Sequence, residues 1–176
     1  MEPTTQTRAS RECGVTLIET MIAAIILLIG VLAIMRLMGV AIAQNLSQGD
    51  VQTRVSEYAE DKMEQLMALS FTDGTTNTTV FPPTSTGGNG LGGIMAANTT
   101  VGGTNVSSPV AGYSDYLDIN GNLLTTSSGA YYERVWSIST DSTGNLKTLT
   151  VTSAATDTTL VAAPTTTLVC IKTNIP

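Results

Sequence analysis

The sequence predicts an α+β protein in which one long N-terminal helix packs on a small antiparallel β-sheet. Three observations support this fold class: an almost uncharged apolar run over residues 15–43, an amphipathic pattern over residues 44–70, and alternating segments near the C-terminus. No proline stands between residues 4 and 81, so one helix is expected to run through both N-terminal regions. Residues 71–176 are then left to form a loop-rich domain that contains the sheet.

Composition limits the function classes to which the chain can belong. The 176 residues include no histidine, and Asp and Glu outnumber Lys and Arg by 14 to 8. The lack of histidine excludes His-based acid–base catalysis, Ser–His and Cys–His nucleophile pairs, and most zinc sites. No serine or threonine has a candidate base, so we expect no enzyme, no cofactor, no metal and no small-molecule substrate. A net charge of −6 also argues against nucleic-acid binding by overall attraction to phosphate.

Residues 1–14 form a polar leader, and residues 15–43 are predicted to contain a membrane span. The stretch from residue 15 to residue 35 carries one charge, Glu19. As a helix it would be about 31 Å long, which matches a hydrocarbon core of about 30 Å. Arg36 ends the span, and the two arginines of the leader predict a cytoplasmic N-terminus. The chain is therefore expected to be a single-pass membrane protein.

An ordinary secretory signal is the alternative interpretation of the apolar run. Such a signal is cut after its apolar stretch, at a site of small residues. Only Ala41-Ile42-Ala43, before Gln44, offers a faint candidate for that cut, so this alternative is less favoured.

Residues 44–70 are predicted to continue the helix as its amphipathic half. Apolar residues recur there at steps of three and four, with charged residues between them. The apolar positions are Val51, Val55, Tyr58, Ala59, Met63, Leu66 and Met67. Because local charge pairs are weak here, this half is expected to gain its stability from packing on the C-terminal domain.

The C-terminal domain is predicted to be a long irregular connection followed by antiparallel strands. Thr, Ser, Gly and Asn dominate residues 72–115, which favours loop structure. After them, Asn120-Gly121 predicts a hairpin with a type I′ turn, and later segments show β-rich alternation. The expected strands are residues 116–119, 122–125, 131–139, 146–153 and 166–172.

The segment 131–139 has two distinct faces. Tyr132, Arg134, Trp136 and Ile138 alternate onto one of them. Trp136 is expected in the core on a half-buried strand, and a cation–π pair with Arg134 is the alternative.

The hairpin region also offers a weaker metal-binding alternative. Asp115, Asp118, Asn120 and Asn122 are closely spaced oxygen donors of the kind that a calcium loop uses. The intervening residues fit a strand and a turn, and no acidic residue stands at the required later position. Calcium binding is therefore not favoured.

The segment from Gly14 to Glu19 carries the functional argument. A lone carboxylate within an apolar span costs about 2.5–3.5 kcal/mol on insertion scales, so Glu19 is expected to be functional. Glycine is the residue that least obstructs a protease gripping extended backbone. A cut after Gly14 would create an amine at Val15, about 6 Å along the helix from Glu19. The candidate partners of Glu19 are this amine and the same amine of a neighbouring copy.

A polar leader ending in Gly14, the Thr16-Leu17-Ile18-Glu19 run and the following apolar segment resemble the type IV pilin family. The resemblance implies that a prepilin peptidase cuts between Gly14 and Val15 and methylates the Val15 amine. It implies that Glu19 offsets the N-terminal charge of a neighbouring subunit in a filament. It also implies the pilin fold and a structural role. The chain would sit in the bacterial inner membrane, with its C-terminal domain periplasmic, before it moves to a pilus on the cell surface.

Two departures from the family pattern concern the helix. The family most often begins its mature chain with Phe or Met, where this chain has Val15, so processing is expected to be slower but to occur. Many major pilins have a proline near the position of Arg36. This chain has none, but it has Gly30 and Gly39, which favour close helix packing. Local loosening of the helix on assembly is the less favoured alternative.

The strand segments resemble a particular group of pilins. Residues 131–138 and 146–152 are similar to PilV-type minor pilins, the type IV pilus modification proteins. Removal of the leader would leave Cys170 as the single cysteine, whereas major pilins commonly close a C-terminal loop with a disulfide. The sequence therefore predicts a minor pilin that works with other pilin subunits. The alternatives are a minor pseudopilin of a type II secretion system and a competence or adhesive tip pilin whose loop at 72–115 contacts a surface or DNA.

Overall fold

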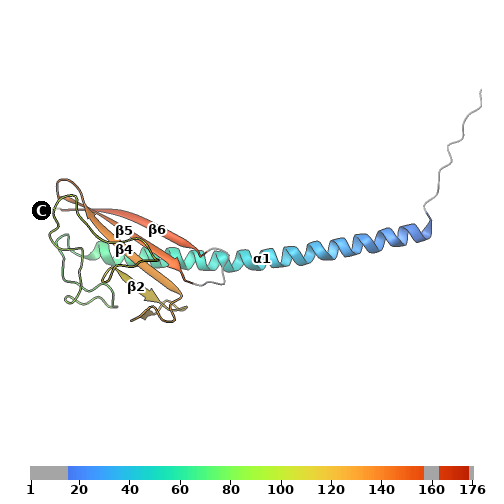
Figure 1. Cartoon of the computed structure of the whole chain (residues 1–176), viewed down its shortest axis with the longest axis horizontal. Coiled ribbons are helices and arrows are strands. Elements are labelled where there is room, and N and C mark those ends of the chain that lie inside the picture. Colours follow the sequence, from blue (N-terminus) through green and yellow to red (C-terminus); the bar gives the residue numbers. More distant parts are fainter. Residues whose placement is uncertain (1–15, 157–162, 175–176) are drawn as a thin grey trace, which may run out of the picture. The chain divides into compact units, whose positions relative to one another are not determined.

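The structure, a computed structural model, describes residues 16–156 and 163–174 and confirms the α+β fold class. Helix α1 (Leu17–Ala68; Figure 1) is followed, within the described residues, by three short and three longer strands. The chain divides into two compact units, Met1–Asn45 and Leu46–Pro176, and α1 contributes to both.

The first unit consists, in its described part, of the apolar portion of α1. The helix begins after Thr16, whose carbonyl oxygen accepts the backbone N–H groups of Glu19 and Thr20 at 3.0 and 3.2 Å. Every residue from 16 to 45 is exposed within the chain. The helix is continuous through Gly30 and Gly39, and an added Cβ at either glycine would meet nothing within 4 Å. This portion of α1 is long and apolar enough to cross a membrane.

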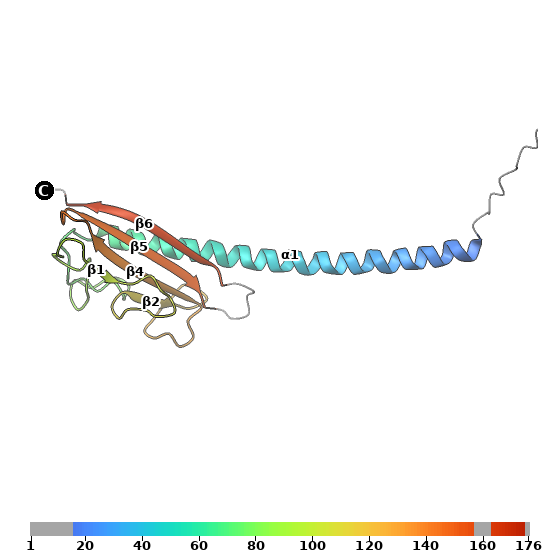
Figure 2. The same ribbon diagram turned by 45° about the horizontal axis from the view of Figure 1, so that its top comes forward.

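The second unit is built on one antiparallel sheet in the order β3-β2-β4-β5-β6, with β1 pairing with β4 beside β2 (Figure 2). Strands β4, β5 and β6 are long and pair along their whole length, whereas the other three are short. The bounds are β1 Thr100–Gly102, β2 Ser114–Leu117, β3 Leu123–Leu124, β4 Tyr132–Thr140, β5 Leu146–Ala155 and β6 Thr165–Thr173.

The hairpin between β2 and β3 differs from the predicted type I′ turn. Leu117 pairs with Leu123, which leaves five residues in the turn rather than two. The Asp118 carboxylate accepts the backbone N–H groups of Asn120 and Asn122, both at 2.8 Å. A side chain that satisfies backbone donors in this way stabilises a wider turn. Strand β1 is a second difference, because it lies within the segment predicted to be irregular.

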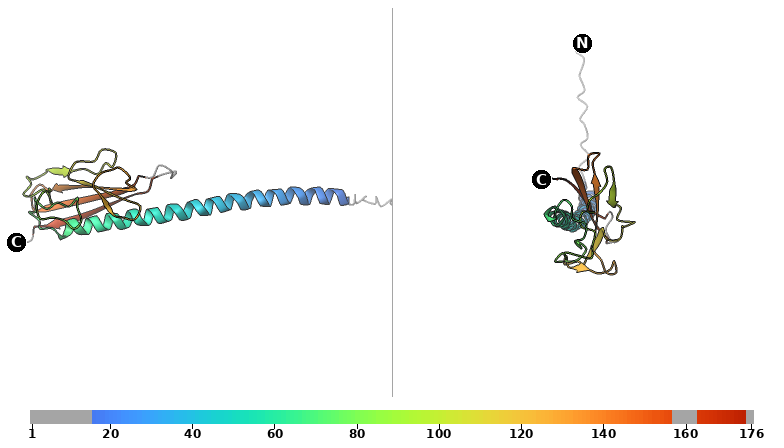
Figure 3. Two further views of the ribbon diagram at one scale, coloured as in Figure 1. Left: turned by 90° about the horizontal axis from the view of Figure 1, so that it is seen from below. Right: turned by 90° about the vertical axis from the view of Figure 1, so that its left-hand side faces the viewer.

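The core lies between one face of the sheet and the amphipathic part of α1 (Figure 3). The predicted periodicity is confirmed, because the helix buries Val55, Ala59 and Leu66 completely. The main cluster contains Ala59, Met63, Leu66, Leu91, Tyr113, Trp136, Ile138, Leu149 and Val151. A smaller cluster contains Val55, Leu117, Tyr132 and Ala155. Packing of a helix against the sheet therefore organises the whole second unit.

Candidate functional site

The predicted processing residues Gly14 and Val15 lie outside the described residues, so the cut between them stays a prediction. Glu19 is described, and it stands in the first turn of α1 with its side chain exposed. A carboxylate is favoured there because unpaired N–H groups give the start of a helix a partial positive charge. No cation of the described residues lies within ion-pair distance of Glu19. The pairing of Glu19 therefore stays a prediction.

The surface of α1 beyond Glu19 is almost free of charge. Arg36 is the single charged residue between Glu19 and Asp50. The large apolar side chains here stay more than two-fifths exposed, as at Leu28 (58%) and Leu37 (72%). A helix that is hydrophobic all round is stable in lipid or among other helices, and water is a poor environment for it. The first unit therefore has the character of a membrane and helix-packing segment.

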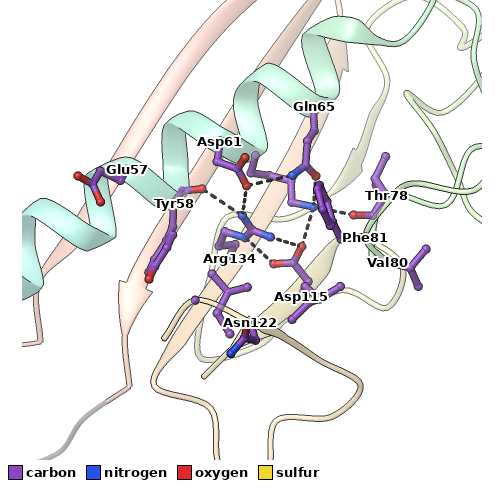
Figure 4. A pocket seen from close by; sticks show the side chains of 14 residues that line it. Glu57, Tyr58, Asp61, Gln65, Thr78, Val80, Phe81, Asp115, Asn122 and Arg134 are labelled. Atoms are coloured by element: carbon purple, nitrogen blue, oxygen red, sulfur yellow. Dashed lines mark hydrogen bonds and ion pairs between the residues drawn. The ribbon is translucent and has the colours of Figure 1, made fainter. Parts of the chain in front are cut away.

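A buried ion network joins the helix to the sheet in the second unit (Figure 4). The Asp115 carboxylate on β2 accepts two hydrogen bonds from Arg134, one from Nε at 2.7 Å and one from Nη2 at 2.9 Å, in a bidentate pair. The same carboxylate lies 2.6 Å from Lys62 Nζ of α1. Arg134 also reaches Asp61 of α1 at 2.9 Å. Two cations and two carboxylates thus fix how this part of α1 lies on the sheet.

Lys62 is the most enclosed member of this network. Its side chain is 1% exposed, and its Nζ also donates to the Thr78 carbonyl at 2.6 Å. The ammonium lies 4.5 Å from the centre of the Trp136 ring. The cation that packs on this ring is therefore Lys62, whereas the sequence suggested Arg134. Burial lowers the pKa of Lys62, and the Asp115 charge opposes that shift.

Sequence reasoning missed this network, although one signal was present. Lys62 stands three residues after Ala59 and four before Leu66, on the apolar stripe of the helix. A lysine at such a position is typical of a buried, paired cation. Its partners could not be identified, because Asp115 and Arg134 are far away in the sequence.

A pocket of about 580 Å³ opens beside the network. Its rim carries the carboxylates of Glu57 and Asp61 together with the exposed ring of Phe81 (Figure 4). The charged groups at its floor already bind one another, which gives them a structural role. The calcium alternative gains no support, because the Asp115 carboxylate already pairs with the side chains of Lys62 and Arg134. The Asp118 carboxylate accepts backbone N–H groups of its own turn.

A second buried lysine holds the long loop after α1 against the sheet. Lys147 Nζ on β5 donates to the carbonyls of Phe71, Leu91 and Gly93 at 2.7–2.8 Å. Burial lowers the pKa of Lys147, while the charge of Asp73 raises it. Lys147 therefore holds the segment that was predicted to be irregular through three of its backbone carbonyls. The Asp73 carboxylate also accepts the backbone N–H groups of Thr75 and Thr76.

All cations of the second unit have partners. Lys172 Nζ donates to the Met67 carbonyl near the end of α1 at 2.7 Å, and Arg54 pairs with Asp50 at 3.2 Å. Lys62, Lys147 and Arg134 are committed to the contacts given above. Within residues 46–156 and 163–174 no lysine or arginine is left without an ion pair or a hydrogen bond. Such a surface offers little to the phosphates of a nucleic acid.

Comparison with known protein families supports a type IV pilin-like protein. Residues 9–35 match the family described as the prokaryotic N-terminal methylation motif. Searches of curated proteins and of solved structures give no significant match. The motif is that of structural proteins and implies processing by a prepilin peptidase and assembly with other pilins. Together with the apolar helix, it indicates a membrane-anchored pilin-like protein.

Proposed function

We propose that this chain is a minor subunit of a type IV pilus that enters or primes the filament through α1. The observation that carries the proposal is the methylation motif over residues 9–35, which continues into a helix whose apolar surface has no partner among the described residues. The small sheet of the second unit agrees with the pilin layout. Similarity of residues 131–138 and 146–152 to PilV-type minor pilins supports the minor role.

In the proposed pathway, the apolar part of α1 first holds the chain in the inner membrane. The peptidase cuts after Gly14 on the cytoplasmic side and methylates the Val15 amine. Helices then leave lipid and pack side by side, where the amine of a neighbour approaches Glu19. A charge-assisted contact is strong in such a low-dielectric setting, so it offsets the cost of the buried carboxylate.

Intact-mass analysis of the chain from sheared pili tests this proposal. We expect a species that lacks residues 1–14 and carries one extra methyl group, present at a small fraction of the major subunit. Gly14→Ala should be cut normally or slowly, whereas Gly14→Leu should block the cut, because a bulky side chain obstructs the protease. These two variants are a matched pair that differ only in side-chain size.

Genetic deletion separates the minor pilin from its alternatives. Fewer or no pili, with protein secretion unchanged, would support the pilus role. Loss of secretion with normal pili would instead assign the chain to a type II secretion system. A mature N-terminus near Gln44 would contradict the whole pilin interpretation.

A further inference from the structure

The two edges of the sheet differ sharply in length and in protection. One edge is formed by short pieces, of which β3 has two residues. The other edge is β6, which pairs with β5 over nine residues, Thr165–Thr173. Within the described residues, no backbone group of Thr165–Thr173 has a hydrogen bond outside the β5–β6 pairing. Because alternate residues of an antiparallel strand turn their N–H and C=O groups outward, β6 presents a row of unpaired groups.

Strand β6 lacks most features that prevent an exposed edge from pairing. It has no proline, and its single charge, Lys172, lies on the inner face and is bound to the Met67 carbonyl. The outer face carries Val169 and Ile171, each 61% exposed. Leu146 of β5, opposite Thr173, is also exposed and extends this apolar strip. Natural sheets usually protect such an edge with charge, proline or a covering segment.

We propose that the β6 edge is a docking site for an extended strand of a different protein, which adds to the sheet by main-chain hydrogen bonds. The incoming strand would carry apolar side chains at alternate positions, to lie against Val169 and Ile171. Main-chain bonds would supply affinity, and the apolar strip would set the register.

Charge identifies the kind of partner. Residues 46–176 contain eleven Asp and Glu against five Lys and Arg, a net charge of −6. The cations are committed to internal contacts, so the accessible charge of this unit is acidic. A second copy would bring the same net charge and repel the first. A basic strand from another protein fits this edge.

The test uses the full chain in detergent micelles and a synthetic probe. The probe is a nine-residue labelled peptide of alternating valine and threonine with lysine at both ends. We expect saturable binding by fluorescence anisotropy and new hydrogen-exchange protection at alternate amides of Thr165–Thr173. N-methylation of alternate peptide nitrogens should reduce binding at least tenfold, because it removes main-chain donors. Replacing the terminal lysines by glutamates should also weaken binding at least tenfold.

Variants of the chain locate the site. The double variant Val169→Lys/Ile171→Lys should weaken binding at least tenfold, while exchange of the β5 amides shows that the sheet is intact. Ile119→Lys is the matched control, because Ile119 is 52% exposed but lies in the β2–β3 turn. It should change binding less than twofold.

Three results would overturn the proposal. They are equal binding of the N-methylated peptide, equal binding by the double variant, and protection of β6 by concentration-dependent dimerisation of the chain alone. The last result would assign the edge to a second copy.

Discussion

The two parts of α1 share one helical backbone but differ in what stabilises them. From Leu17 to Asn45, no side chain is buried and the single basic residue is Arg36. From Leu46 to Ala68, one stripe of the helix packs on the sheet, and two of its charged residues enter a buried network. The first part therefore needs partners from outside the chain, whereas the second part has its partners within the fold.

This difference separates assembly from folding. Changes in the first unit should alter membrane residence or filament entry and leave the sheet domain stable. Changes in the second unit should alter folding and leave the membrane anchor in place. The effect of a substitution on the unfolding free energy of the second unit should therefore depend on the unit in which the residue lies.

The largest effect is expected at Trp136, which is completely buried under α1. Trp136→Ala should destabilise the second unit by about 4 kcal/mol, because it removes the largest core side chain and leaves a cavity. Hydrogen exchange of the β4 and β5 amides measures this loss. The variant should still float with membranes. Leu28→Ala, at an exposed apolar position of the first unit, should leave the exchange unchanged. Equal effects of the two substitutions would contradict the separation.

The ion network should show the next largest effect. Asp115→Asn leaves Lys62 and Arg134 with one carboxylate fewer, and we expect a loss of about 3 kcal/mol in denaturant unfolding. Adding Lys62→Met should recover part of that loss, because it removes a cation that has lost its partner. Strictly additive losses would show that the two residues do not act together. Asp50→Asn, in the exposed pair with Arg54, should cost less than about 0.5 kcal/mol.

A gain in stability is expected at Glu133, which is buried on β4. Burial raises the pKa of Glu133, although a hydrogen bond with Tyr116 opposes the shift, and Oε1 has no partner among the described residues. A raised carboxyl pKa favours folding while the group is protonated, and this stability is lost as the pH rises through the folded-state pKa. Glu133→Gln should therefore stabilise the second unit by about 1 kcal/mol at pH 7.

Thermal melts at two pH values check this sign. The gain from Glu133→Gln should disappear below the normal glutamate pKa, about 4.3, where the carboxyl group is protonated in both states. Glu60→Gln, at an exposed position of α1, should show no gain at either pH. A gain that persists unchanged at pH 3 would show that charge is not its cause.

The smallest effect on the second unit is expected from Gly39→Ala. An added Cβ there meets nothing in the chain, and alanine favours a helix over glycine by about 1 kcal/mol. Unfolding of the second unit should shift by less than about 0.5 kcal/mol. If Gly39 serves close packing between helices, filament entry should fall although the helix itself is more stable. Unchanged filament entry would remove that role.

The sequence predicted elements whose periodicity is strong. The three- and four-residue steps of α1, and the alternation at Tyr132, Arg134 and Trp136, repeat often enough to indicate which face is buried. The helix pattern is confirmed by the core. The half-buried strand is wrong for β4, because Glu133 and Val135 on its second face are buried as well. The fold class follows from these patterns because each buried face requires a matching apolar face.

Contacts between distant segments could not be predicted in the same way. Lysine and arginine are usually exposed to solvent, so burial was not expected at Lys62, Arg134 and Lys147. Their partners come from other strands and loops. The β2–β3 turn differs from the predicted type I′ turn because the Asp118 carboxylate accepts the backbone N–H groups of Asn120 and Asn122. These hydrogen bonds stabilise a turn that is wider than two residues. The processing residues Gly14 and Val15 and the pairing of Glu19 stay predictions, because a partner chain or a protease decides them.

The measurement that tests the central claim most directly is the filament content of a Glu19→Ala variant. We expect normal loss of residues 1–14 and normal amounts in the membrane, but at least a tenfold lower content in sheared pili. Thr20→Ala is the matched control, because the Thr20 hydroxyl bonds only to the Leu17 carbonyl among the described residues, and it should assemble normally. Glu19→Asp should separate charge from reach along the helix. Entry of Glu19→Ala into filaments at the wild-type level would contradict the claim that α1 assembles through this carboxylate.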